Sequence, residues 1–326
     1  MKYIVLLSGK DTPLAFEEFK SVLQKQGADL DILQQYSDRL FIMDLKKQIF
    51  FSDLAQTRSI SRLLGTAEDY NSVEWKNHID GTAAVRSIKI PGSYICESSL
   101  IEKRIGASIY DSGIKIDLDN PQNIITLYLS PQIRLLGSQV FASSDNTFSS
   151  RKPDVRPFRK PISLDPQVAR TMLNLARVKA GDSVADPFAG TGGILIEAGL
   201  MKCRVFGMDI DAEMVDGTMK NLDYFNIRSY KLKVGDAFDL RSMFGDTFDT
   251  IVTDFPYSKN TKNVDSRKIA QKYIEYIPSV LNPNRYACIA SNHSDLDIPS
   301  TLELTFKYEI ILHKSLSKFI YVLKKK

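Results

Sequence analysis

From residue 163 onward, short apolar runs alternate with stretches of helical periodicity. Runs such as "DSVADP", "RVFGMDI" and "FDTIVTDF" have the length and composition of buried strands, and "LDPQVARTMLNLARV" and "AEMVDGTMKNLDYF" have helical spacing. Strands that alternate with helices of this length predict a doubly wound, mainly parallel sheet. The last two strands, "FKYEIILHK" and "KFIYVLK", are joined by a short turn, so we expect them to form an antiparallel pair at the end of the sheet.

Residues 1–145 follow a different rhythm, in which shorter strands mix with helices. The run "YIVLLSG" is strand-like, "LAFEEFKSVLQKQGA" has helical spacing, and the pattern restarts near residue 83 with the strand-like "AVRSIKI". This mixture predicts an α+β region. The polar, proline-broken sequence at 146–162 then predicts a linker, and the α/β pattern occupies 163–326.

Composition and sequence pattern argue against a membrane-spanning protein and against a secreted one. The chain has 326 residues, of which 43% are hydrophobic and 25% charged, as is typical of soluble proteins with more than one domain. No apolar run approaches the roughly 20 residues that cross a bilayer. The opening "MKYIVLLSGKDTP" lacks the cleavage pattern of a signal peptide. We therefore expect a cytoplasmic protein with no membrane partner.

Cysteine and histidine are sparse and scattered. Cys96, Cys203 and Cys288 lie far apart, and the three histidines share no metal-ligand spacing. The sequence therefore predicts neither a disulfide framework nor a metal site.

A glycine-rich turn follows the first strand of the C-terminal half. In "ADPFAGTGGILIEAG", Gly190, Gly192 and Gly193 stand between a strand and a helix. Glycines there let a ligand approach the backbone, and the free N–H groups of the helix can bind an acceptor. The turn is not a phosphate-binding P-loop, because no Gly-Lys-Ser/Thr follows it.

Acidic residues stand at four of the expected strand ends. Asp209 lies 19 residues beyond Gly190, where a carboxylate can accept both ribose hydroxyls of a nucleoside. Asp236 stands where an adenine amino group can be recognised, and Asp186 and Asp254 end two other strands. Each acid alone is as typical of a turn as of a binding site. Their shared position predicts a pocket for an adenosine-bearing cofactor.

These motifs resemble those of S-adenosyl-L-methionine-dependent amino-methyltransferases. "DPFAGTGG" is similar to the cofactor loop of that family, and "DFPY" to its Asp-Pro-Pro-Tyr catalytic motif, with Phe255 in the second place. More narrowly, "RPFRKPISLDPQVARTMLNLARV", "GMDIDAEMVDGTMKNL" and "LHKSLSKFIYV" resemble the archaeal tRNA (guanine-10-N2)-methyltransferases. In the N-terminal half, "VRSIKI", "SSLIEKRIGASI" and "IDLDNPQN" resemble a THUMP domain, the RNA-binding module of that family.

The resemblance implies a Rossmann-like methyltransferase domain at 163–326, a basic linker at 146–162 and a THUMP domain at 61–145, preceded by a ferredoxin-like α+β region at 1–60. It implies S-adenosyl-L-methionine as the cofactor and tRNA as the partner, and related enzymes can work with a small zinc-binding activator protein. The residues that it assigns to the cofactor are Asp186, Phe188, Gly190, Thr191, Gly192, Asp209, Ile210, Asp236, Ala237 and Asp254.

The catalytic residues implied by the resemblance are Asp254, Pro256 and Tyr257. The exocyclic N2 of guanine is a poor nucleophile, because its lone pair is delocalised into the ring. A carboxylate at Asp254 or the backbone carbonyl of Phe255 can accept hydrogen bonds from this amino group and favour the pyramidal geometry that attack requires. Pro256 stiffens the turn, and Tyr257 can stack on a base taken out of its helix.

Basic residues gather in the expected linker. The stretch "RKPDVRPFRK" contains five basic residues and one acid. It can be a solvated linker or a strap that contacts RNA phosphates. A base-flipping enzyme needs an electrostatic hold on the surrounding duplex, which favours RNA contact by Arg151, Lys152, Arg156, Arg159 and Lys160.

Two other functions remain open at this stage. One is an amino-methyltransferase that acts on another tRNA guanine or another nucleic acid, although the THUMP-like half favours RNA. The other is a non-catalytic RNA-binding protein on a methyltransferase fold, against which the set Asp254, Pro256 and Tyr257 argues. A nicotinamide dehydrogenase is disfavoured, because "AGTGG" lacks the G-x-G-x-x-G spacing. The expected product is N2-methyl- or N2,N2-dimethylguanosine.

Overall fold

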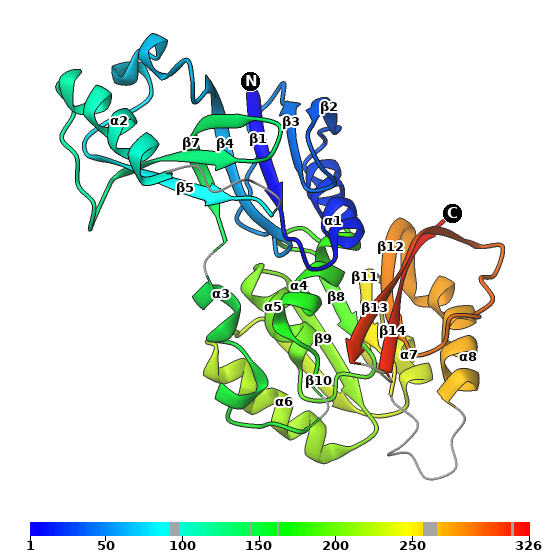
Figure 1. The fold of residues 1–326 in the computed structure, drawn as a ribbon. Helices are drawn as coiled ribbons and strands as arrows, with labels where there is room; N and C mark the ends of the chain where they lie inside the picture. The colour runs from blue at the N-terminus through cyan, green and yellow to red at the C-terminus, as the bar shows by residue number, and fades with distance from the viewer. Residues whose placement is uncertain (92–97, 144, 162, 257–265, 314–315) are drawn as a thin grey trace. The chain divides into compact units, whose positions relative to one another are not determined.

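The computed structural model describes residues 1–91, 98–143, 145–161, 163–256, 266–313 and 316–326 (Figure 1). The chain divides into two compact units. The N-terminal unit comprises Met1–Phe16, Gly27–Ser52 and Gln56–Ser143, and the C-terminal unit comprises Glu17–Gln26, Asp53–Ala55 and Ser144–Lys326. Helix α1 (Thr12–Lys25) therefore begins in one unit and ends in the other.

One sheet organises the N-terminal unit, with the strand order β2-β3-β1-β4-β7-β6-β5. Neighbouring strands pair antiparallel except β5 and β6, which are parallel. The expected boundary near residue 60 falls inside β4, which pairs with both β1 and β7. The strands are β1 (Lys2–Leu7), β2 (Asp31–Gln35), β3 (Leu40–Asp44), β4 (Thr57–Thr66), β5 (Ala83–Lys89), β6 (Asn123–Leu129) and β7 (Arg134–Ala142).

Helix α2 (Ser98–Asp111) packs against β5, and Ile105 and Ile109 are its buried residues. Isoleucines four positions apart lie on one helix face, so the helix turns this face to the sheet. The short 3-10 helices η1 (Tyr70–Ser72) and η2 (Trp75–Asn77) close the same core, into which Trp75 is buried.

The sheet of the C-terminal unit has the strand order β10-β9-β8-β11-β12-β14-β13. Strands β10, β9, β8, β11 and β12 are parallel, whereas β14 is antiparallel to both β12 and β13. The prediction of a doubly wound sheet that ends in an antiparallel pair is confirmed. The strands are β8 (Ser183–Asp186), β9 (Arg204–Asp209), β10 (Tyr230–Val234), β11 (Phe248–Asp254), β12 (Leu281–Ser291), β13 (Leu302–His313) and β14 (Leu316–Lys325).

Helices flank this sheet in two groups: α5 contacts both α4 and α6, and α7 contacts α8 (Figure 1). The core between the sheet and α8 includes the fully buried Phe248, Ile251, Tyr273 and Ile277. The helices are α3 (Asp145–Ser149), η3 (Pro153–Val155), α4 (Pro166–Leu175), α5 (Gly193–Leu200), α6 (Ala212–Tyr224), η4 (Ala237–Asp239), α7 (Leu240–Phe244) and α8 (Ser266–Val280). Among the described residues, no helix has the length and apolar composition to cross a membrane.

Candidate active site

The order in which strands are added to the sheet reverses between the parallel strands β8 and β11, and α/β sheets bind ligands at such a point, beyond the carboxyl ends of their strands. Asp186 ends β8, Asp209 ends β9 and Asp254 ends β11, and Asp236 follows β10. The structure therefore gathers the four predicted acids along one edge of the sheet.

Helix α6 fixes the glycine turn. Gly190 and Gly192 have positive φ angles of 51° and 78°, which side chains rarely adopt. A Cβ on Gly192 would lie 2.8 Å from Cγ2 of Thr218, so the turn also needs glycine for space. Thr218 Oγ1 donates a hydrogen bond to the Gly190 carbonyl at 2.8 Å, and Asn221 Nδ2 donates one to the Thr191 carbonyl at 2.9 Å. Two buried polar side chains thus fix the conformation of the turn.

Asp209 links this turn to β9. Its Oδ2 accepts the Gly190 N–H at 2.8 Å, and its Oδ1 accepts the Asp211 N–H at 3.0 Å. Burial raises the pKa of Asp209, while these two backbone N–H groups oppose the shift. The neighbouring Ile210 is 78% exposed, so an apolar surface stands beside the carboxylate at this strand end.

Asp186 is the most buried acid of the edge. Its Oδ1 accepts hydrogen bonds from Thr253 Oγ1 at 2.6 Å and from the Phe188 N–H at 3.2 Å, so it ties β8 to β11. Burial raises the pKa of Asp186 to about 7, with the charges of Asp254 and Asp209 acting in the same direction. The carboxyl is therefore a mixture of neutral and ionised forms near neutral pH.

The remaining cofactor candidates differ in exposure. Asp236 caps η4, where its side chain accepts the Phe238 N–H at 3.0 Å, and Ala237 is buried. Phe188 packs edge to face against Phe255, with ring centroids 5.4 Å apart.

Phe255 occupies the second place of the catalytic motif. Its ring is 5% exposed and also meets Tyr273, with centroids 6.0 Å apart. Its backbone N–H donates to the Ala290 carbonyl at 2.9 Å, which extends the pairing of β11 with β12 by one residue. The departure from proline therefore has a packing reason: an aromatic ring at this position fills the core beside the turn.

Asp254 meets a charge partner that the sequence reasoning missed. Its Oδ2 forms an ion pair with Nζ of Lys318 on β14. Burial raises the pKa of Asp254, and Lys318 opposes this shift. Oδ1 is buried and has no hydrogen-bond partner within the described residues. Pro256 is partly exposed, and Tyr257 lies outside the described residues.

The five linker residues separate into two groups. Arg151 forms an ion pair with the fully buried Glu197 at 2.6 Å, and the guanidinium of Arg156 is buried, with Nε donating to the Arg151 carbonyl at 2.9 Å. Lys152 and Arg159 are exposed, and Lys160 forms an ion pair with Glu213 at 2.7 Å. Arg151 and Arg156 therefore face the protein interior, which leaves Lys152, Arg159 and Lys160 at the surface.

Several contacts at this site had only weak signals in the sequence. A lysine inside the apolar run "KFIYV" could have indicated Lys318, and polar residues on the inner face of a helix could have indicated Thr218 and Asn221. Phe158 is fixed by Asn221, which accepts its N–H at 2.9 Å and donates to its carbonyl at 2.8 Å. These are contacts between distant segments, which no local pattern encodes.

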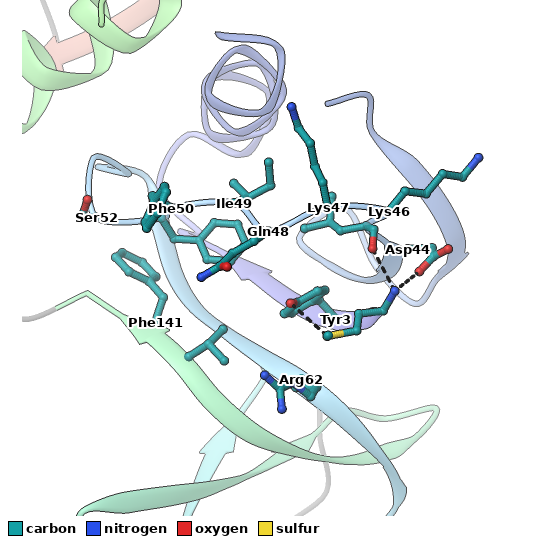
Figure 2. A pocket seen from close by; sticks show the side chains of 14 residues that line it. Tyr3, Asp44, Lys46, Lys47, Gln48, Ile49, Phe50, Ser52, Arg62 and Phe141 are labelled. Atoms are coloured by element: carbon teal, nitrogen blue, oxygen red, sulfur yellow. Dashed lines mark hydrogen bonds and ion pairs between the residues drawn. The ribbon is translucent and has the colours of Figure 1, made fainter. Parts of the chain in front are cut away.

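A separate cleft of about 910 Å³ lies in the N-terminal unit (Figure 2). Lys46, Lys47, Phe50, Arg62 and Phe141 are among its lining residues. Figure 2 shows the two lysines at one end and the two phenylalanines at the other, and Phe50 is 70% exposed. The cleft thus combines positive charge with aromatic surface.

The site and the fold define a class of protein. Residues 153–302 match the family model described as an RMKL-like methyltransferase domain. The crystal structure of TrmN from Thermus thermophilus covers 100% of both chains with a TM-score of 0.57 at 17% identity, which shows a common fold. The chain is a Rossmann-like methyltransferase.

Two relatives place it more narrowly. The tRNA (guanine(10)-N2)-dimethyltransferase of Methanothermobacter thermautotrophicus is 36% identical and aligns over 100% of both chains. The protein of the same name from Pyrococcus abyssi is 34% identical over 87% of this chain and 88% of its own. The chain belongs to the tRNA (guanine(10)-N2)-dimethyltransferase family.

Proposed function

We propose that the protein transfers methyl groups from S-adenosyl-L-methionine to the exocyclic N2 of a guanosine in tRNA, at position 10. The products are N2-methyl- or N2,N2-dimethylguanosine. The observation that carries this proposal is Asp254, a buried carboxylate at the carboxyl end of β11 that keeps one oxygen without a partner among the described residues. Family membership and the names of the relatives support the choice of tRNA and of the guanine.

The carboxyl ends of the strands, where Asp186, Asp209, Asp236 and Asp254 lie, fit the cofactor. The glycine turn leaves space where a side chain would collide with Thr218, and Asp209 stands beside it at the next strand end. When bound, S-adenosyl-L-methionine supplies an electrophilic sulfonium methyl group. The residues proposed to hold it are Asp186, Phe188, Gly190, Thr191, Gly192, Asp209, Ile210, Asp236, Ala237 and Asp254.

Asp254 acts on the guanine base, which accepts the methyl group. Its Oδ1 accepts a hydrogen bond from the guanine amino group, which holds the nitrogen in place and shifts electron density onto it. With the cofactor bound beside it, the N2–carbon bond would form as the sulfur–carbon bond breaks, and that bonding pair would stay on sulfur. The alkylated nitrogen is strongly acidic, so Asp254 Oδ1 can take its proton and pass it to water. Pro256 and Tyr257 complete the proposed catalytic set.

Recognition of tRNA is assigned to two regions. The exposed Lys152 and Arg159, with Lys160, are proposed to contact phosphates beside the target. The THUMP-like residues 61–145 and the preceding residues 1–60 are proposed to bind the tRNA body within the N-terminal unit. A cytoplasmic location accords with a tRNA substrate.

The experiment is methyl transfer from labelled S-adenosyl-L-methionine to an unmodified tRNA transcript, followed by nucleoside digestion. We expect label in N2-methyl- or N2,N2-dimethylguanosine, and a transcript that lacks the guanine at position 10 is the control. Label in the purified system shows activity without a small zinc-binding activator protein. Cofactor binding with label in another nucleoside would refute the proposed acceptor atom.

A further inference from the structure

Lys318 reaches Asp254 across the end of another strand. In the sheet, β12 lies between β11 and β14, and Asp254, Ala290 and Ile320 stand opposite one another in register. The first residue of β14 that pairs with β12 is Phe319, opposite Ser291, so Lys318 lies just beyond the carboxyl end of β12. Residues two apart on a strand share a face, so Lys318 shares the face of Ile320 and Asp254.

This contact is buried on both sides. The side chain of Lys318 is 11% exposed and that of Asp254 is 20% exposed, and Nζ contacts Oδ2. Burying a lysine stem and its ammonium group loses both hydration and conformational freedom, which a purely solvating lysine does not incur. Within the part of the chain that the structure describes, the carboxylate of Asp254 is the group that the ammonium of Lys318 contacts.

The surroundings of Asp254 favour its neutral form. Burial disfavours a charge on Asp254, and the carboxyl group of Asp186 on β8 interacts with it as a like charge. The ammonium group of Lys318 opposes the rise of the Asp254 pKa through its charge and its hydrogen bond. A protonated carboxyl would be a weaker acceptor for an amino group and could not take a proton from the product.

The ion pair also distinguishes the two oxygens. Oδ2 is occupied by the lysine, whereas Oδ1 has no partner within the described residues. A carboxylate without this anchor can rotate about its Cβ–Cγ bond and present either oxygen. With Oδ2 held by Lys318, the carboxylate cannot rotate freely, and Oδ1 is the acceptor oxygen that points in a fixed direction.

We propose that Lys318 is a positioning residue for methyl transfer, which anchors Oδ2 of Asp254 and leaves Oδ1 as the acceptor of the guanine amino group. The inference rests on the proposed function of Asp254. The lysine touches neither the methyl group nor the base, and it acts on the reaction only through the carboxylate.

The test compares Lys318→Met with Lys318→Arg in single-turnover methyl transfer. Lys318→Met keeps the stem and removes the charge, so we expect kcat to fall roughly 100-fold, as misplacement of a reacting group does. Affinities for tRNA and S-adenosyl-L-methionine should change less than about threefold, since uniform binding is untouched. Lys318→Arg should recover most of the rate. Lys324→Met, the same change at the other end of β14, should leave the rate unchanged.

A pH profile separates this role from a structural one. Without Lys318 the pKa of Asp254 rises, so the acid limb of the kcat profile should move to higher pH and the deficit should shrink as pH increases. A structural defect would lower kcat equally at every pH. A Lys318→Met enzyme with the wild-type rate and profile would overturn the inference, as would a uniform loss that arginine does not repair.

A double-mutant cycle decides the case in which Lys318→Met folds poorly. In the Asp254→Asn background the carboxylate is absent, so adding Lys318→Met should cause little further loss of kcat, whereas additive losses would contradict the proposal. Failure of the proposed function is distinguishable, because the wild-type enzyme would then place no label on guanine N2.

Discussion

At the scale of single residues, the site depends on carboxyl groups that share one edge but meet different partners. Asp209 has both oxygens bonded to backbone N–H groups, Asp186 accepts from Thr253, and Asp254 is paired with a lysine. Burial raises the pKa of all three carboxyl groups, and a different set of partners opposes the rise in each. Different partners are how one edge of a sheet can combine ligand binding with chemistry.

Asp254→Ala should abolish methyl transfer, because the residue acts on the guanine amino group. It should leave the affinity for S-adenosyl-L-methionine nearly intact, because the nine other residues proposed to hold the cofactor remain. Asp209→Ala is the reciprocal variant: it should weaken cofactor binding by about 1–3 kcal/mol, the cost of a lost charge-assisted hydrogen bond. Calorimetry of cofactor binding and single-turnover transfer measure the two effects. Loss of cofactor binding in Asp254→Ala, with the melting temperature preserved, would show that its assignment to the acceptor side is wrong.

Asp186 gives a prediction for stability against pH. Its folded pKa of about 7 exceeds the ordinary value of 3.8, so between these values the folded state holds more protons than the unfolded state. The free energy of unfolding should therefore fall as pH rises from about 4 to 7, by roughly 4 kcal/mol at most from this group. Asp186→Asn should remove that component, so its unfolding free energy relative to wild type should increase over this range. A difference that is constant from pH 4 to pH 8 would contradict the raised pKa.

At the scale of elements, helix α6 braces both the cofactor turn and the linker. A Cβ on its Gly217 would lie 2.0 Å from Cδ1 of Phe158, so the ring of the linker residue rests directly on the helix backbone. Thr218 and Asn221 on the same helix bond to Gly190, Thr191 and Phe158. One helix thus couples the two segments that flank the site.

Gly217→Ala should destabilise the protein by about 1–3 kcal/mol, although alanine favours helices, because the added methyl must displace Phe158. The matched control is Gly106→Ala in α2, where a Cβ meets nothing within 4 Å and should stabilise by about 0.5–1 kcal/mol. Denaturant unfolding of both variants provides the comparison. Equal effects of the two substitutions would mean that Phe158 moves away at no cost.

The features of the fold and of the site that could be predicted from the sequence are those encoded by neighbouring residues. The period of apolar residues and the helix opening at Asp165, whose side chain accepts the Gln167 N–H at 2.8 Å, are encoded within a few residues. The inward turn of Arg156 depends on burial beside Glu197, 41 positions away, and the Lys318–Asp254 pair joins strands 64 positions apart. Such contacts follow from tertiary packing, so the sequence predicted the acidic edge but not the lysine that pairs with it.

At the scale of the whole molecule, the two units divide the proposed work between methyl transfer and tRNA binding. A deletion of residues 1–150 would test this division poorly. Glu17–Gln26 and Asp53–Ala55 belong to the C-terminal unit, where Lys25 Nζ bonds to Asn174 Oδ1 at 3.2 Å and to Asp53 Oδ2 at 2.8 Å. Removing them would take buried partners from the methyltransferase unit. Point variants within the N-terminal unit are the cleaner probe.

The cleft in Figure 2 supplies such variants, since basic and aromatic side chains together are typical of surfaces that bind unpaired nucleotides. Phe50→Ala should weaken tRNA binding by about 1–3 kcal/mol through lost stacking, and Arg62→Ala should lower the slope of log affinity against log salt by about one. Arg58→Ala is the control. Arg58 is exposed on β4, the strand that also contains Arg62, but it does not line the cleft. Titrations at several salt concentrations distinguish the two effects. Wild-type affinity and salt slope in both cleft variants would place the tRNA on another face of the N-terminal unit. An equal loss of tRNA affinity in Arg58→Ala would mean that the cleft variants act through the net charge of the protein and not through the cleft.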